Sequence, residues 1–319
     1  MTFVNRVAWT ALSGSLLAFS PSASAVLIGL GDGTGNTTQP QGLAGWSNVG
    51  RVGSASGVYL GNGWVLTAHH VGLSAASTIT FYPSDQFPTG GVTYALDFST
   101  RVQLRDPNNS NLSADLDLVR TVTDPGLSPL KISTASPTSA AITMVGFGVN
   151  RGAAVQYNAT WQQVDSGGAY AGYLINPNGT GDVNGFAKRW GTSTTTPFPG
   201  GETVGAAFVN DTATNVFTAA FTPSTSIGVS GDSGGAVFSS AAPNTLLGII
   251  LYEDYLSVPA GQPNGNTSSA VIFGNGMDAA DLSQYNAQIQ AVIPEPANAL
   301  LIAGLFGFFC LRHRRPLIA

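Results

Sequence analysis

Gly231-Asp232-Ser233-Gly234-Gly235 leads into the apolar run Ala236-Val237-Phe238. Glycines on both sides let the backbone bend sharply and leave the serine hydroxyl exposed, as acyl-transfer chemistry requires. The backbone N–H groups of Gly231 and Ser233 are candidate donors to a developing oxyanion. A glycine-rich turn between two strands is the alternative interpretation, because the chain has 40 glycines among its 319 residues.

A catalytic serine needs a base within hydrogen-bond reach, and histidine is the usual one. The chain has three histidines, His69, His70 and His313. His313 follows a C-terminal apolar run and is expected to lie apart from the domain, so the candidate base is His69 or His70. Both precede Ser233, which excludes the α/β-hydrolase order, in which the histidine follows the serine and the acid.

The candidate orienting acid lies in Asp115-Leu116-Asp117-Leu118-Val119, where two carboxylates open an apolar strand. Asp115 stands before the strand proper, where a carboxylate can meet an imidazole and remain shielded. Asp117 alternates with two leucines, so we expect its side chain to face solvent. Asp115 is therefore favoured over Asp117. Histidine, aspartate, serine is one of the three known orders of a catalytic triad.

Three blocks resemble the signature motifs of chymotrypsin/trypsin-like serine proteases: Val65-Leu66-Thr67-Ala68-His69-His70, Asp115 to Val119, and Gly231 to Gly235. Met144-Val145-Gly146-Phe147-Gly148 and Leu247-Gly248-Ile249-Ile250 resemble two further strands of that family. The resemblance covers residues 48 to 293 in outline. Alignment with the first block implies that His70 is the base and that His69 occupies an alanine position.

The resemblance implies an all-β fold of two antiparallel six-stranded β-barrels (chymotrypsin-like) with a C-terminal helix. The active site would lie between the barrels. Ser233 would attack a peptide carbonyl, His70 would transfer the proton and Asp115 would hold the imidazole. No cofactor or metal is implied, and the partner is a protein or peptide substrate.

Substrate choice in this family implies a pocket at Ile227, Tyr252 and Glu253. Isoleucine at the first position favours an apolar or shallow pocket, whereas Glu253 would narrow the pocket or place a charge at its wall. The resemblance also implies that a new N-terminus pairs with the acid before the serine. Cleavage after Ala25 would leave a Val26 amine to pair with Asp232; the alternative is that local backbone donors satisfy Asp232.

Composition limits the class of partner. Charged residues make up 9% of the chain, against about 25% in typical proteins, and the net charge is −5. Only two lysines are present, which argues against nucleic acid because phosphate contacts need a basic surface. The single cysteine, Cys310, excludes an internal disulfide.

Residues 1–25 have the features of a secretory signal peptide. Arg6 precedes an apolar run from Val7 to Phe19, and Ala23-Ser24-Ala25 has the small-x-small form that signal peptidase cleaves. We therefore expect residues 26–290 to form an exported protease domain.

Residues 291–319 resemble the PEP-CTERM sorting signal of Gram-negative bacteria. Pro294-Glu295-Pro296 is followed by an apolar run from Ala297 to Leu311 and by Arg312-His313-Arg314-Arg315. The run is shorter than the roughly 20 residues of a stable membrane span. The resemblance implies transient membrane insertion, recognition by an exosortase, and delivery to the cell surface or extracellular matrix.

Short apolar runs separated by turn residues predict many strands, as in sandwiches and barrels. The expected strands are 56–60 and 64–68 (a hairpin), 78–82, 92–96, 116–121, 141–147, 206–209, 216–221, 236–238, 246–252 and 270–273. A helix is expected at 281–293, capped by Asp278 or Asp281. Residues 26 to about 50 are expected to be an irregular lead-in, and residues 150–205 long loops or a flap.

The sequence thus predicts an exported serine endopeptidase. Two alternatives stay open at this point: a catalytically inactive protease-fold protein that binds at the cell surface, and a secreted serine esterase using the same three residues.

Overall fold

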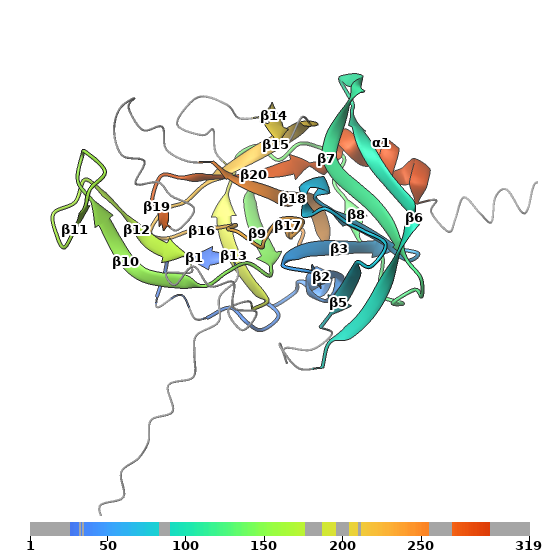
Figure 1. Cartoon of the computed structure of the whole chain (residues 1–319), viewed down its shortest axis with the longest axis horizontal. Helices are drawn as coiled ribbons and strands as arrows, with labels where there is room; N and C mark the ends of the chain where they lie inside the picture. Colours follow the sequence, from blue (N-terminus) through green and yellow to red (C-terminus); the bar gives the residue numbers. More distant parts are fainter. Residues whose placement is uncertain are drawn as a thin grey trace, which may run out of the picture.

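The computed structural model describes residues 26–31, 33, 35–82, 90–175, 187–195, 204–209, 212–254 and 270–293. Within these residues the chain forms twenty β-strands, two short 3-10 helices and one α-helix (Figure 1). The predicted all-β class with a C-terminal helix is confirmed. The predicted signal peptide at 1–25 lies outside the described residues, as does the sorting segment from residue 294 onward.

The first half of the chain forms a closed six-stranded antiparallel barrel with the strand order β2-β3-β4-β7-β6-β5. Its strands are β2 (Val49–Val52), β3 (Ala55–Gly61), β4 (Trp64–Thr67), β5 (Thr78–Phe81), β6 (Val92–Asp106) and β7 (Asn109–Thr121). The predicted hairpin joins β3 to β4 through Asn62 and Gly63, which both have positive φ. Inward-facing aliphatic side chains such as Val65, Ile79 and Val119 are fully buried in the barrel core.

Strands β6 and β7 are much longer than the sequence predicts. They continue past the barrel as one hairpin, which Figure 1 shows projecting beyond the other strands. Most side chains near its tip are polar and exposed, so the apolar alternation that marks a half-buried strand is absent there.

The second half of the chain forms an eight-stranded sheet with the path β13-β9-β17-β18-β20-β15-β14 and with β8 beside β18. These strands are β8 (Lys131–Ile132), β9 (Ala141–Gly146), β13 (Arg189–Thr194), β14 (Val204–Val209), β15 (Thr212–Ala220), β17 (Ala236–Ser239), β18 (Thr245–Asp254) and β20 (Gly276–Asp281). One isolated bridge, between Thr195 and Ala219, links the end of β13 to β15. The six strands from β13 to β15 therefore approach the expected second barrel, although closure depends on that single bridge.

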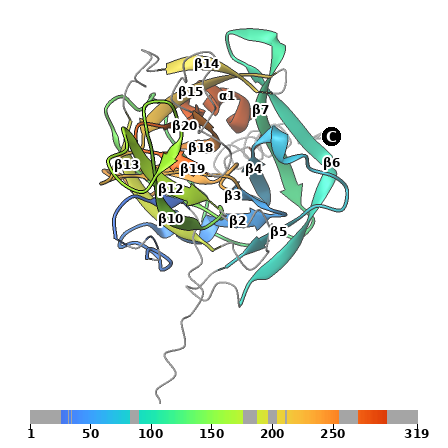
Figure 2. The ribbon, with the colours of Figure 1, turned by 60° about the vertical axis from the view of Figure 1, so that its left-hand side comes forward.

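The expectation of long loops at 150–205 is wrong for the described part of that span. Strands β10 (Arg151–Tyr157), β11 (Gln163–Val164) and β12 (Tyr170–Ile175) form a four-stranded sheet with β19 (Ala270–Ile272). Figure 2 shows this sheet in front. The rings of Trp161 and Tyr170 stack at 4.2 Å, and this small aromatic core holds together a segment whose glycines and asparagines suggested loops.

The lead-in is also more ordered than expected. It contains β1 (Leu27–Ile28), which pairs with β16 (Ser226–Ile227), and the 3-10 helix η1 (Ala44–Asn48). Val26 and Leu27 are fully buried. The three apolar residues Val26-Leu27-Ile28 are too short a run to predict a strand, yet Val26 and Leu27 belong to the core of the second unit, which the eight-stranded sheet forms.

Helix α1 (Leu282–Val292) follows β20 directly. Asp281 is its N-cap and accepts from the Ser283 N–H at 3.0 Å. Leu282, Tyr285 and Ile289 form the buried face of the helix. No helix among the described residues is long and apolar enough to cross a membrane.

Replacing Asp281 by alanine is expected to lower the free energy of unfolding by about 1–2 kcal/mol. The variant loses the acceptor for the Ser283 N–H and for the Ser136 hydroxyl. Urea denaturation measures the change, and Gln290→Ala, on the exposed side of the same helix, is the matched control. Equal stability of the two variants would contradict the capping role.

Candidate active site

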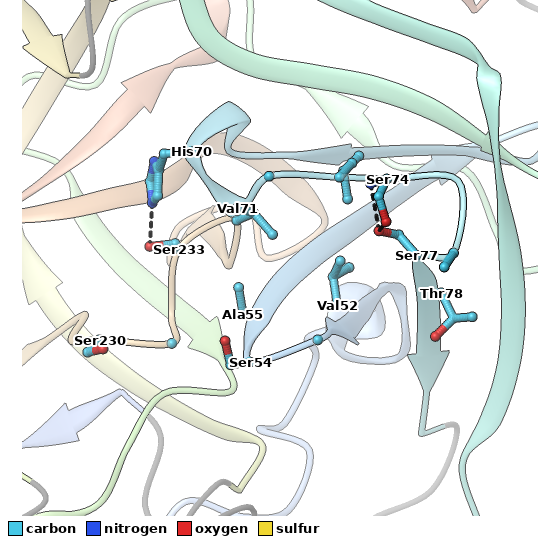
Figure 3. Close-up of a pocket in the computed structure, with 15 residues that line it drawn as sticks. Val52, Ser54, Ala55, His70, Val71, Ser74, Ser77, Thr78, Ser230 and Ser233 are labelled. Carbon is cyan, nitrogen blue, oxygen red and sulfur yellow. Dashed lines mark hydrogen bonds between the residues drawn. The ribbon is translucent and has the colours of Figure 1, made fainter. Parts of the chain in front are cut away.

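Three predicted site residues meet where the first barrel faces the second unit. His70 lies on the 3-10 helix η2 (His69–Val71), just after β4, Asp115 lies on β7, and Ser233 lies on the turn between β16 and β17. His70 Nδ1 is 2.6 Å from Asp115 Oδ2, and His70 Nε2 is 2.8 Å from Ser233 Oγ. Figure 3 shows the His70 ring directed at the Ser233 hydroxyl.

The surroundings of Asp115 select one tautomer of His70. The carboxylate is buried (1% exposed) and also accepts from the His70 backbone N–H at 2.8 Å. The carboxylate accepts the Nδ1 proton, so the Nε2 lone pair can accept the Ser233 proton. A second buried residue, Thr214, accepts from the Asp115 N–H at 2.8 Å and holds this part of β7 in place. This is the geometry that general-base activation of a serine requires.

The serine turn depends on two glycines. Gly231 and Gly234 have φ of 92° and 81°, in the left-handed region that favours glycine. A Cβ at Gly234 would overlap the Ser56 carbonyl and the Thr67 hydroxyl. Gly234 therefore allows strands β3 and β4 of the first barrel to contact the turn directly.

The two candidate oxyanion donors, Gly231 and Ser233, are oriented by their neighbouring carbonyls. Ser230 O accepts from the Val149 N–H at 2.9 Å, and Asp232 O accepts from the Gly235 N–H at 2.6 Å. In a trans peptide the N–H points away from the preceding carbonyl, so both donors are directed away from these anchors. Neither N–H donates a hydrogen bond to another described residue.

Ser56 on β3 fastens the serine turn to the first barrel, and sequence reasoning missed it. Its N–H donates to Ser233 O at 2.9 Å, and its hydroxyl donates to Gly231 O at 3.1 Å. The same hydroxyl accepts from the Phe147 N–H at 3.0 Å. The only signal in the sequence is a polar residue at the start of an apolar run, which now lies fully buried.

The carboxylate of Asp232, next to the serine, is fully buried and held by three backbone N–H groups. Gly148 donates to Oδ1 at 2.7 Å, while Val229 and Val26 donate to Oδ2 at 2.9 and 3.1 Å. A Cβ at Gly146 or Gly148 would overlap this carboxylate. The Gly-Phe-Gly motif noted in the sequence is therefore the wall of the Asp232 site.

His69 and Asp117 form a separate pair. The expectation that Asp117 faces solvent is wrong: its side chain is fully buried, accepts from Arg101 Nε at 2.8 Å and lies 3.1 Å from His69 Nδ1. Asp117 shares a strand face with Asp115, but Arg101 of β6 covers it. An exposed surface was the simplest expectation from alternation alone, because the covering guanidinium belongs to another strand.

Two cavities adjoin Ser233. One, of 580 Å³, extends on the side of the first barrel and is lined by small apolar and hydroxyl side chains, as Figure 3 shows. The other, of 260 Å³, is lined by Tyr252 and Glu253 and by residues near the serine, among them Gly228 and Ser230. Glu253 Oε1 accepts from the Ser230 N–H at 3.0 Å.

Ile227, the third predicted pocket residue, lines neither of these two cavities. It is fully buried and pairs with Leu27 across β1 and β16. The side chain packs into the core because the N-terminal segment covers it. Glu253 is thus the acidic group that the structure places at the smaller cavity.

No protein-family model matches the chain, and no curated protein matches it. Solved structures with some similarity include the MamO protease domain from Magnetospirillum magneticum, 13% identical, covering 77% of this chain and 97% of that one with a TM-score of 0.44. A mutant of human heparin binding protein is 13% identical over 82% of this chain and 97% of that one, with a TM-score of 0.49. Mouse neuropsin, a serine protease, is 16% identical over 79% and 96%, with a TM-score of 0.47. At these values the assignment of the site rests on its own geometry.

The described residues hold no group of three His, Cys, Asp or Glu side chains placed to bind a metal ion.

The pKa of Asp232 gives the site a predicted pH dependence. Burial raises this pKa from 3.8 to about 7; the N–H groups of Val229, Gly148 and Val26 lower it, and the charge of Glu253 raises it. Because the folded-state pKa is raised, the stabilising contribution is complete below the unfolded value and is lost as the pH rises through the folded value.

Between about pH 4 and pH 8 the full-length chain is therefore expected to lose about 4 kcal/mol of unfolding free energy relative to Asp232→Asn. Urea denaturation of both proteins at several pH values measures this difference. A difference that stays constant over the range would contradict the assignment.

Proposed function

We propose that this chain is a serine endopeptidase in which Ser233 is the nucleophile, His70 the general base and acid, and Asp115 the orienting carboxylate. The observation that carries the proposal is the continuous hydrogen-bonded line from the buried Asp115 carboxylate through the His70 ring to the Ser233 hydroxyl, with lengths of 2.6 and 2.8 Å.

In the proposed reaction His70 Nε2 takes the Ser233 proton while Oγ attacks the peptide carbonyl. The negative charge that develops on the carbonyl oxygen is held by the N–H groups of Gly231 and Ser233. His70 then donates its proton to the leaving amine. Water, activated by the same imidazole, releases the acyl group from Ser233. Asp115 stabilises the imidazolium in both steps without accepting its proton.

The two cavities support cleavage within a chain. They extend from Ser233 to either side and have volumes of 580 and 260 Å³, so an extended peptide has room on both sides of the bond that breaks. An ester of a small alcohol would leave the larger cavity mostly empty. The intact His70–Asp115 pairing argues against an inactive binding protein, which has no need of it.

The N-terminal segment supports maturation by cleavage after Ala25. Val26 has φ of 39°, a conformation that is strained for a β-branched residue inside a chain. Cleavage after Ala25 would remove this strain, because a new N-terminal residue has no preceding carbonyl group. The new amine would lie where the Val26 N–H now contacts Asp232. A buried ammonium beside this carboxylate would favour its ionised form.

We expect mass spectrometry of the active protein to find Val26 as the first residue. The processed chain should react faster with a serine-directed probe than Ala25→Pro, in which cleavage after residue 25 is blocked. An active protein that retains residues 1–25 would contradict this step.

Export completes the proposal and rests on the two terminal segments. Residues 1–25 would direct secretion through signal peptidase, and residues 291–319 would be inserted transiently and processed by an exosortase at the surface. Deleting 294–319, which leaves helix α1 intact, is expected to move the protein from the cell surface into the medium. Unchanged surface retention would count against a sorting role.

A fluorophosphonate probe tests the chemistry directly, because it labels only an activated serine. We expect rapid labelling of the wild-type protein, none of Ser233→Ala, and a rate lower by at least about a thousandfold for His70→Ala. His69→Ala is the matched control, since Asp117 keeps its Arg101 partner, and its rate should stay within about tenfold of wild type.

The opposite result, with His69→Ala inactive and His70→Ala active, would reassign the base. Absence of labelling in wild-type protein that has lost residues 1–25 would refute the proposed activity. If the wild-type protein is labelled, cleavage of a mixed peptide library distinguishes a peptidase from an esterase.

A further inference from the structure

The glycine-rich segment that precedes the first barrel wraps one guanidinium group. Arg151 Nη1 donates to Ile28 O at 2.6 Å, and Nη2 donates to Gly31 O at 2.6 Å. Two longer contacts run from Nη1 to Gly29 O at 3.3 Å and Leu30 O at 3.4 Å. Four successive carbonyls therefore converge on a single side chain.

Tyr173 of β12 completes this clamp. Its ring lies 4.0 Å from the Arg151 guanidinium carbon, and its hydroxyl donates to Gly29 O at 3.1 Å. Gly31 and Gly33 have positive φ, and a Cβ at Gly33 would overlap the guanidinium. The glycines of the lead-in, which the sequence alone left without a role, allow the backbone to close around Arg151.

In the sequence, Arg151 comes just after two residues, Gly148 and Val149, whose N–H groups bind the serine turn. The Gly148 N–H binds the Asp232 carboxylate, and the Val149 N–H binds Ser230 O. Arg151 comes two residues later, at the start of β10, where the β10–β12 pairing is irregular. The clamp thus ties the N-terminal segment to the wall of the Asp232 site.

The N-terminal segment reaches that site from its other end. Ile28 is held by Arg151 and by pairing with Ser226, and two residues earlier the Val26 N–H contacts Asp232. Hydrogen bonds from a charged, planar donor are stronger than neutral ones and restrict geometry more. Apart from Arg151, residues 27–29 are held by the two-residue pairing of β1 with β16, by the Gly29 N–H that donates to Thr225 O at 2.9 Å, and by the Tyr173 hydroxyl. Arg151 extends this hold to Leu30 O and Gly31 O.

We propose that Arg151 is a positioning residue for the serine turn: by clamping the carbonyls of residues 28–31 it keeps Val26 against Asp232 and so holds Gly231 and Ser233 in their oxyanion-binding orientation. The sheet formed by β10, β11, β12 and β19 is then the support for this clamp. The catalytic part of the inference rests on the proposed function, whereas the coupling between the two segments does not.

Amide hydrogen exchange of the full-length chain tests the coupling without relying on activity. In Arg151→Ala we expect protection to fall by at least about tenfold in residues 26–31 and, together with it, in residues 229–235. Arg120→Ala is the matched control, because Arg120 is exposed on β7 and lies over the Trp64 ring. Loss of protection in 26–31 with unchanged protection in 229–235 would overturn the proposal.

Reaction with the fluorophosphonate probe supplies the second readout. Arg151→Ala should be labelled about tenfold more slowly than wild type, and methylguanidinium at millimolar concentration should restore both the rate and the protection of 229–235. Sodium chloride at the same concentration should restore neither the labelling rate nor the protection. Labelling of Arg151→Ala at the wild-type rate would refute the positioning role.

The two failures are distinguishable. An unreactive wild-type protein would refute the proposed function, while the exchange result would still decide the coupling. If Arg151→Ala does not fold, Arg151→Lys retains the charge but loses the planar fork. The lysine variant should show a smaller loss of protection in both segments, and no change in 229–235 would again overturn the proposal.

Discussion

The burial of the Asp232 carboxylate is the constraint on which the serine turn depends. A fully buried carboxylate is costly unless its oxygens accept hydrogen bonds, and here the donors come from Val26, Gly148 and Val229. These residues belong to three distant segments, so satisfying one charge assembles the N-terminal segment, the end of β9 and the serine turn. Because Asp232 directly precedes Ser233, this assembly also determines how the proposed nucleophile is oriented.

The site needs both halves of the fold. His70 and Asp115 belong to the closed barrel, and Ser233 belongs to the second unit. Ser56 bridges the two by hydrogen bonds to both carbonyls that flank Asp232. In the proposed reaction these hydrogen bonds hold Ser233 and Gly231 in place before a substrate binds, which is the condition under which hydrogen-bond donors stabilise a transition state most effectively.

Local patterns predicted the residue types of the site better than their surroundings. The order of histidine, aspartate and serine and the glycines around Ser233 follow from the sequence. Alternation with two leucines predicted that Asp117 faces solvent, because it could not reveal that Arg101 covers this carboxylate. Ile227 likewise aligns with a pocket position but lies under β1. In both cases the deciding neighbour comes from the adjacent strand, β6 beside β7 and β1 beside β16, and the sequence of one strand does not show which strand pairs with it.

From the sequence alone one can infer a strand-rich chain, the hairpin around Asn62 and Gly63, a capped C-terminal helix and a short set of candidate catalytic residues. Each of these is encoded over a few neighbouring positions. The partners of each side chain are not: His70 meets Asp115 across 45 residues and Ser233 across 163, and Val26 meets Asp232 across 206. Only the tertiary structure shows that His70, and not His69, contacts Ser233, and that the glycine-rich lead-in surrounds Arg151. The physical reason is that the hydrogen-bond partners of these buried groups lie in segments remote in the chain.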